Sequence, residues 1–142
     1  MYQTYKKEEK KLMKVVILAG GFGSRLAEYT KTIPKPMVKV SGKPIIQRII
    51  EHYVSYGHYD FHIALGYKGK VIKDYFLKKK LNQKIKINLI DTGRNTMTGG
   101  RLKRLKKYLN ETFLMTYGDG LSNVNINKLI KFHKKNKKLF TL

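Results

Sequence analysis

Apolar runs typical of buried strands alternate with amphipathic segments along most of the chain. The run KVVILA at 14–19 has the length of a buried strand, and the segment at 44–57 repeats isoleucine at helical spacing between Pro44 and Gly57. Further strands are expected at 60–66, 84–90 and 112–118, and further helices at 70–80, 101–109 and 126–136. Because strand and helix alternate through short connections, the pattern predicts an α/β fold with a doubly wound, mainly parallel sheet and helices on both faces.

The two ends of the chain depart from this alternation. Residues 1–12 are polar and rich in lysine, which predicts an N-terminal extension without ordered structure and a folded domain over residues 13–142. The last five residues, KLFTL, are typical of a strand that has barely begun, so we expect a domain truncated at its C-terminus. An apolar edge strand without a neighbour would favour self-association.

The formal net charge of +22 raises the alternative of a nucleic-acid-binding protein. Lysine accounts for 26 of the 31 basic residues and is spread along the chain, whereas arginine, the preferred reader of base edges, occurs five times. No nucleic-acid recognition motif accompanies the charge. The distribution therefore favours a solvated surface with a general affinity for phosphates.

Cysteine content and hydropathy indicate where in the cell the protein is expected. The chain has no cysteine, which excludes a disulfide framework and a thiolate metal site and is typical of a reducing cytoplasm. Its apolar runs fall short of the ~18 to 20 residues that a membrane-spanning helix needs, and its N-terminus lacks the apolar core of a signal peptide. We expect a cytoplasmic protein without membrane contact.

The loop after the first expected strand, AGGFGSR, has the composition of an anion site. Gly20, Gly21 and Gly23 let backbone amides approach a ligand closely. The spacing matches neither common phosphate motif, because there is no Gly-x-x-x-x-Gly-Lys and Leu26 stands where a dinucleotide motif needs its third glycine. Arg25 in the loop, and the Lys35 that Pro34 and Pro36 flank, add two cations. Together these residues predict a polyphosphate site.

Two later loops supply complementary groups. Asp119 in YGDG follows an expected strand and could hold Mg²⁺, although an aspartate that bonds its own turn is the alternative. In TMTGGR, Gly99 and Gly100 precede a helix, where a glycine pair can cap the helix or face a flat ligand such as a base. Thr96, Thr98 and Arg101 offer hydrogen-bond donors there. The four histidines lack metal-ligand spacing, and Ser24 lacks a histidine and an acid in recognisable relation, so neither metal binding by histidine nor nucleophilic catalysis is expected.

The stretch MKVVILAGGFGSRL, followed by PKPMVKVSGKPII, resembles the N-terminal signature of the sugar-phosphate nucleotidyltransferases. Within that superfamily, DTG, MTGGRLKR and YGDGLSNVNI resemble the glucose-1-phosphate cytidylyltransferases. The resemblance implies a Rossmann-like catalytic domain that forms CDP-glucose and pyrophosphate from CTP and glucose 1-phosphate with Mg²⁺, on the way to surface polysaccharides.

The same resemblance implies roles for individual residues. Arg25, Lys35 and Asp119 would be catalytic, the first two as phosphate-binding cations and Asp119 as the metal ligand. The nucleotide-binding residues would be Leu18, Ala19, Gly20, Gly21, Gly23, Ser24, Arg25, Lys35, Thr96, Gly100, Arg101 and Gly118.

Two departures from the family pattern limit what the resemblance implies. The stretch between GYKG and DTG is shorter than in the best-known cytidylyltransferases, which leaves base and sugar preference open. The chain also stops about half-way through a family member, before a second metal-binding aspartate and most of the sugar-phosphate site. The interpretation therefore leaves open impaired or absent turnover, a non-catalytic nucleotide-binding module, a homo-oligomer, and an enzyme half that a second polypeptide completes.

Overall fold

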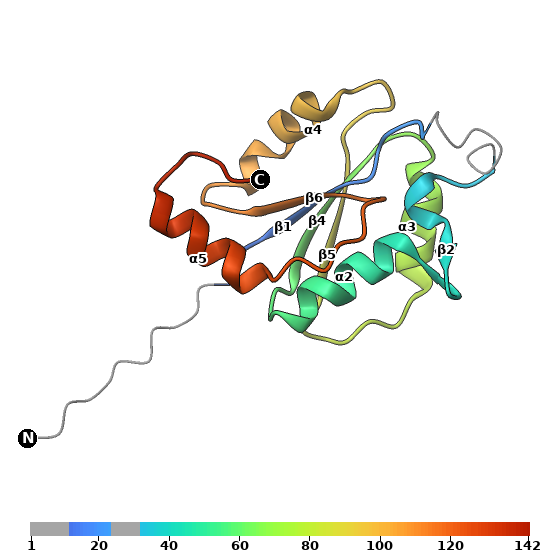
Figure 1. Cartoon of the computed structure of the whole chain (residues 1–142). Helices are drawn as coiled ribbons and strands as arrows, with labels where there is room; N and C mark the ends of the chain where they lie inside the picture. Colours follow the sequence, from blue (N-terminus) through green and yellow to red (C-terminus); the bar gives the residue numbers. More distant parts are fainter. Residues whose placement is uncertain (1–11, 24–31) are drawn as a thin grey trace, which may run out of the picture.

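A four-stranded parallel sheet forms the centre of the computed structural model, which describes residues 12–23 and 32–142 (Figure 1). The strands are β1 (Val15–Leu18), β4 (Asp60–Leu65), β5 (Lys86–Asp91) and β6 (Leu114–Tyr117), in the order β5-β4-β1-β6. Val15 pairs with Phe61 on one side and with Leu114 on the other. The chain therefore builds the sheet outward from β1 to β5, then returns to add β6 beside β1.

Helices cover both faces of this sheet, as the alternation predicts (Figure 1). Helices α2 (Ile45–Ser55), α3 (Gly69–Lys78) and α5 (Ile126–Asn136) contribute to one core cluster, and α4 (Thr98–Leu105) contributes to the other. Strand β1 divides its side chains between them, because Val15 and Ile17 join the first cluster while Val16 and Leu18 join the second. The predicted α/β fold with a mainly parallel, doubly wound sheet is confirmed.

Several element boundaries differ from the sequence-based expectation. Strand β5 begins at Lys86 rather than at residue 84, because the chain from Asn82 to Ile85 forms a turn. Helix α4 begins at Thr98, earlier than expected, and a 3-10 turn, η3 (Lys106–Tyr108), continues it. The strand expected at 138–142 is wrong, because these residues adopt no regular structure and Leu139 and Leu142 are fully exposed.

A short hairpin and a 3-10 turn connect β1 to α2. The turn η2 (Lys35–Met37) follows Pro34, and β2 (Lys39–Val40) pairs antiparallel with β3 (Lys43–Pro44). Ser41 and Gly42 both have positive φ, the backbone of a two-residue hairpin turn. The Ser-Gly dipeptide between two short apolar stretches was an available signal for this hairpin.

The buried His62 lies on β4, where its ring is 5.5 Å from that of Tyr108. Its Nε2 atom is 3.2 Å from Oδ1 of Asp60, yet neither ring nitrogen has a hydrogen bond with a described residue. Burial lowers the pKa of His62; Asp60 opposes that shift and Lys14 adds to it.

None of the helices in residues 12–23 and 32–142 is long and apolar enough to cross a membrane.

Acidification is expected to destabilise the fold through His62. A histidine whose folded-state pKa lies below its unfolded value takes up a proton on unfolding, so its contribution is complete above the unfolded pKa of about 6.5 and is lost below it. We expect the free energy of unfolding to fall as the pH drops below about 6.5, by at most ~1.4 kcal/mol per pH unit for this proton. Urea unfolding at several pH values should show that the stability of His62→Gln depends less on pH than that of the wild type. Equal pH dependence of the two proteins would contradict this account.

Candidate active site at the point where the strand order reverses

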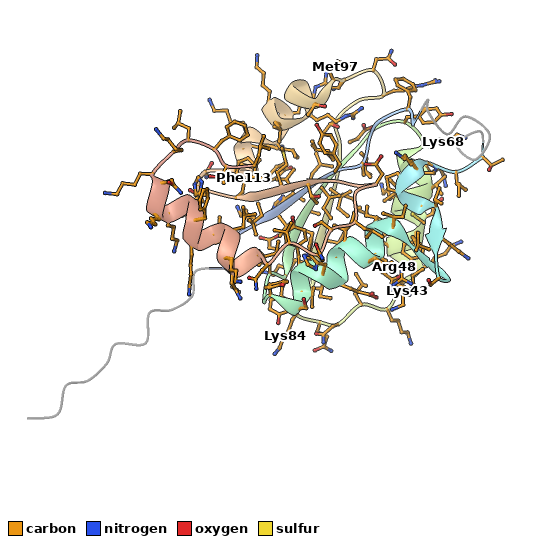
Figure 2. All side chains as sticks on the ribbon, viewed as in Figure 1. Lys43, Arg48, Lys68, Lys84, Met97 and Phe113 are labelled. Atoms are coloured by element: carbon orange, nitrogen blue, oxygen red, sulfur yellow. The ribbon has the colours of Figure 1, made fainter. Side chains whose placement is uncertain are left out.

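A cavity of about 310 Å³ lies at the carboxyl ends of β1 and β6, between which the order of the sheet reverses. In open parallel sheets this reversal opens a crevice, because the loops after the two strands run to opposite faces. The cavity extends to the loop before α4, which follows β5. Figure 2 shows Met97 of that loop and Lys68, which precedes α3, at this same end of the sheet.

Most of the described residues proposed for nucleotide binding line this cavity. They are Leu18, Ala19, Gly20, Gly21, Gly23, Lys35, Thr96 and Arg101, and the proposed metal ligand Asp119 lines the cavity as well. Gly100 and Gly118 do not line it, and Ser24 and Arg25 lie outside the described residues. Thr98, which the sequence offered as a donor beside Thr96, also lines it, whereas sequence reasoning missed Phe22, Pro36, Asn95, Met97 and Tyr117. The parallel topology thus brings together loops that are distant in the sequence.

Lys35 and Asp119 form an ion pair in the cavity. Nζ of Lys35 lies 2.6 Å from Oδ2 of Asp119, and each side chain is about one-third exposed, at 29% and 32%. Lys35 is placed by η2, with Pro34 before it and the buried Pro36 after it. A cation that suits phosphate and a carboxylate that suits a metal ion therefore occupy one space.

Gly118 determines where Asp119 lies. Its amide donates to the carbonyl oxygen of Leu18 at 2.9 Å, and a Cβ atom at this position would lie 3.0 Å from Cγ of Pro36 and 3.2 Å from that same carbonyl oxygen. The absence of a side chain lets the end of β6 approach both β1 and η2 closely. Gly118 therefore does not line the cavity but packs against Leu18 and Pro36, which do.

Arg101 lies at the back of the cavity, and only 4% of it is exposed. Nη2 is 2.7 Å from the carbonyl oxygen of Gly20, and Nη1 is 3.0 Å from that of Leu65. Burial lowers the pKa of Arg101 below its usual value, the nearby Arg104 lowers it further, and Asp91 raises it. The guanidinium group thus reaches two other loops of the sheet from α4.

A group of aromatic and basic side chains adjoins Phe22, one of the residues that line the cavity. The rings of Phe22 and Tyr67 are 5.1 Å apart. Nζ of Lys68 lies 5.2 Å from the centre of the Tyr67 ring, and Cζ of Arg94 lies 5.6 Å from it. Cations near the ring are attracted by its electron-rich face, and they make this side of the cavity positive.

No cluster of three or more histidine, cysteine, aspartate or glutamate side chains suited to a metal ion occurs in the part of the chain that the structure describes. Asp119 is the carboxylate that lines the cavity. Mg²⁺ commonly takes one or two protein carboxylates and completes its shell with phosphate oxygens and water. The arrangement therefore fits a metal ion that a polyphosphate ligand brings with it.

Comparison with known proteins agrees with this geometry. Residues 14–142 match the family model described as nucleotidyl transferase. The chain belongs to the nucleotidyl transferase family. It is 44% identical to the glucose-1-phosphate cytidylyltransferase of Salmonella typhimurium over 92% of this chain and 59% of the relative. It is 42% identical to the probable glucose-1-phosphate cytidylyltransferase of Bacillus subtilis over 86% of this chain and 56% of the relative.

Solved structures of the family share the fold. The crystal structure of HddC from Yersinia pseudotuberculosis complexed with GMP-PN has a TM-score of 0.75 and 34% identity, over 86% of this chain and 54% of that one. A UDP-glucose pyrophosphorylase complexed with UDP-glucose, at 20% identity and a TM-score of 0.72, supports the fold alone. The chain spans little more than half the length of the relatives that it matches.

Replacing Gly118 by alanine is expected to destabilise the fold and weaken ligand binding together. The added methyl would press on the carbonyl oxygen of Leu18, which cannot retreat because β1 is buried and paired on both sides. Such overpacking typically costs about 1–3 kcal/mol, measurable by urea unfolding. Gly120→Ala is the matched control, because its Cβ would meet nothing within 4 Å. Equal stability of the two variants would show that the end of β6 does not depend on this contact.

Proposed function

We propose that this chain carries the nucleotide-binding site of a nucleotidyltransferase that converts CTP and α-D-glucose 1-phosphate to CDP-glucose and pyrophosphate. The observation that carries the proposal is the placement of Lys35 and Asp119, 2.6 Å apart, beside a loop of glycines in one cavity. The two glucose-1-phosphate cytidylyltransferases at 44% and 42% identity support the choice of substrates.

The glycine loop and Lys35 bind the triphosphate in this proposal. Gly20, Gly21 and Gly23 present main-chain groups without intervening side chains, and Arg25 with Ser24 adds donors from the same loop. Thr96 and the main chain of Leu18 and Ala19 face the nucleoside. The ammonium group of Lys35 leaves Asp119 and pairs with phosphate oxygens, which carry more negative charge than one carboxylate.

The reaction needs no protein nucleophile. An oxygen of the sugar 1-phosphate is already an anion, and it attacks the α-phosphorus of CTP while the bond to the pyrophosphate breaks, so the electron pair leaves with pyrophosphate. The protein contributes by aligning attacking and leaving groups and by neutralising charge on the transferred phosphorus. Lys35 and Arg25 act on that charge.

Mg²⁺ is the proposed cofactor, and Asp119 is its proposed ligand. The metal ion supplies Lewis-acid stabilisation of phosphate oxygens when it is bound. Asp119 offers one carboxylate oxygen once Lys35 has moved to the triphosphate. Because a single carboxylate binds Mg²⁺ weakly, the metal ion and the nucleotide are expected to enter together.

The sugar 1-phosphate site is proposed to involve parts of the family that this chain does not match. The chain covers 59% of the Salmonella typhimurium relative, and we place a second metal-binding aspartate and most of the sugar contacts in the remainder. Turnover then needs that remainder, in the same polypeptide or in a second one. Nucleotide binding by the present chain is the property that tests the proposal directly.

Lys35→Ala is expected to weaken CTP binding. Removing a charged partner of the triphosphate should raise the dissociation constant at least about tenfold, which corresponds to ~1.4 kcal/mol. Isothermal titration of the chain with CTP and Mg²⁺ measures this. Lys39→Ala removes an exposed lysine of β2 and should bind CTP like the wild type. Equal affinities for all three proteins would remove Lys35 from the triphosphate site, whereas salt-sensitive DNA binding that CTP does not displace would favour the nucleic-acid alternative.

Asp119→Asn should have opposite effects with and without Mg²⁺. In the wild type, Mg²⁺ should strengthen CTP binding, and the variant should lose that gain because its metal ligand is neutral. In EDTA the variant should bind CTP at least as tightly as the wild type, because Lys35 is no longer paired.

Glu51→Gln is the matched control, since Glu51 also pairs with a lysine, Lys43 at 2.9 Å, outside the cavity. This variant should respond to Mg²⁺ like the wild type. An undiminished Mg²⁺ effect in Asp119→Asn would remove Asp119 from the metal site.

Competition between CTP and GTP in the same titrations tests base preference, because a Campylobacter jejuni relative at 34% identity is named a guanylyltransferase.

A further inference from the structure

The guanidinium group of Arg101 contacts the end of one strand and the loops after two others. Nη2 lies 2.7 Å from the carbonyl oxygen of Gly20, after β1. Nη1 lies 3.0 Å from the carbonyl oxygen of Leu65, at the end of β4, and 2.9 Å from that of Gly93, after β5. Because Arg101 itself belongs to α4, one side chain connects four segments at the floor of the cavity.

A buried threonine extends this network. Thr92 is fully buried, and its Oγ1 lies 2.7 Å from Nη1 of Arg101 while donating to the carbonyl oxygen of Leu65 at 2.6 Å. The amide of Thr92 also donates to that oxygen, at 2.9 Å. The ends of β4 and β5 are thus joined both directly and through Arg101.

Two glycines leave the space that this guanidinium group occupies. A Cβ atom at Gly20 or at Gly66 would overlap the terminal guanidinium atoms of Arg101. At Gly66 the added atom would also lie 2.7 Å from the carbonyl oxygen of Gly20. The loops after β1 and β4 therefore approach each other with the guanidinium group between them, which no larger residue at these positions permits.

We propose that Arg101 is a positioning residue, which fixes the glycine loop for the triphosphate through backbone carbonyl oxygens and does not itself recognise the base. Both terminal nitrogens are engaged with protein oxygens, and those oxygens lie at the end of β4 and in the loops after β1 and β5. A donor used in this way orders the loop before the ligand arrives, which lowers the entropic cost of binding. The inference rests on the proposed nucleotide-binding function.

Arg101→Lys separates positioning from charge. Lysine keeps the charge, but its single nitrogen cannot span carbonyl oxygens on three loops. Arg48→Lys is the matched control, because Arg48 also donates to carbonyl oxygens, those of Val40 and Ser41, but in the exposed hairpin away from Met97 (Figure 2). Each variant and the wild type would be titrated with CTP and with inorganic tripolyphosphate.

The positioning role predicts that Arg101→Lys weakens both ligands by a similar factor, about tenfold or more, while Arg48→Lys weakens neither. Loss of CTP affinity with unchanged tripolyphosphate affinity would overturn the proposal in favour of base recognition. Unchanged affinity for both ligands would overturn it as well, because charge alone would then suffice.

Hydrogen exchange gives a readout that does not need a ligand. In Arg101→Lys, amides of residues 20–22, 66–68 and 92–96 should exchange about tenfold faster or more, while those of α2 should be unchanged. A uniform increase over the whole domain would reduce Arg101 to a general contributor to stability and overturn the positioning role. If wild-type protein binds neither ligand, the proposed function fails, and local exchange still decides whether Arg101 orders the loops.

Gly66→Ala provides a second route if Arg101→Lys does not fold. Gly66 does not line the cavity, and its new methyl group would displace the guanidinium group without removing it. The same joint loss of CTP and tripolyphosphate affinity is expected. Wild-type affinity for both ligands in this variant would overturn the proposal.

Discussion

One guanidinium group binds carbonyl oxygens at or just beyond the carboxyl ends of three parallel strands. Buried carbonyl groups must find donors, and strand ends are where the sheet stops providing them. Arg101 supplies donors to Gly20, Leu65 and Gly93, so the positions of these loops depend on one another. The cavity that they border is consequently a property of the whole sheet edge and not of a single glycine loop.

This network leaves positive charge beside the cavity. The recorded partners of the Arg101 guanidinium group are neutral oxygens, whereas Lys35 has the carboxylate of Asp119. Burying a cation without a carboxylate partner costs free energy, which Arg101 recovers in part through several charge-assisted hydrogen bonds. The remaining positive potential favours a polyanion over a neutral ligand. The net charge of +22 adds a longer-range attraction that salt would screen.

Periodicity in the sequence sufficed to predict the parallel sheet, its helices and the end of the sheet where the cavity lies, since these follow from the spacing of apolar residues. The local sequence around Arg101 does not predict that its side chain points into the protein, because an arginine near the start of an amphipathic helix usually faces solvent. Gly20 and Gly66 carried the relevant signal, but only the fold shows that they face one side chain. The strand predicted at 138–142 was wrong for a different reason. The apolar composition of this segment favours a strand, but in the described residues Leu139 is exposed and pairs with no other strand.

The position of β6 determines how an acceptor would approach the nucleotide. Among the described residues β6 lies at one side of the sheet, and Tyr117 at its end is 54% exposed, whereas the end of β4 and the loops after β1 and β5 are joined through Arg101. In-line attack requires the acceptor opposite the leaving pyrophosphate. If, as proposed, the glycine loop and Lys35 hold the pyrophosphate end, the acceptor has to approach from the side of Asp119. The loops joined through Arg101 then belong to the nucleotide half of the proposed site, and Asp119 lies where the nucleotide and its acceptor would meet.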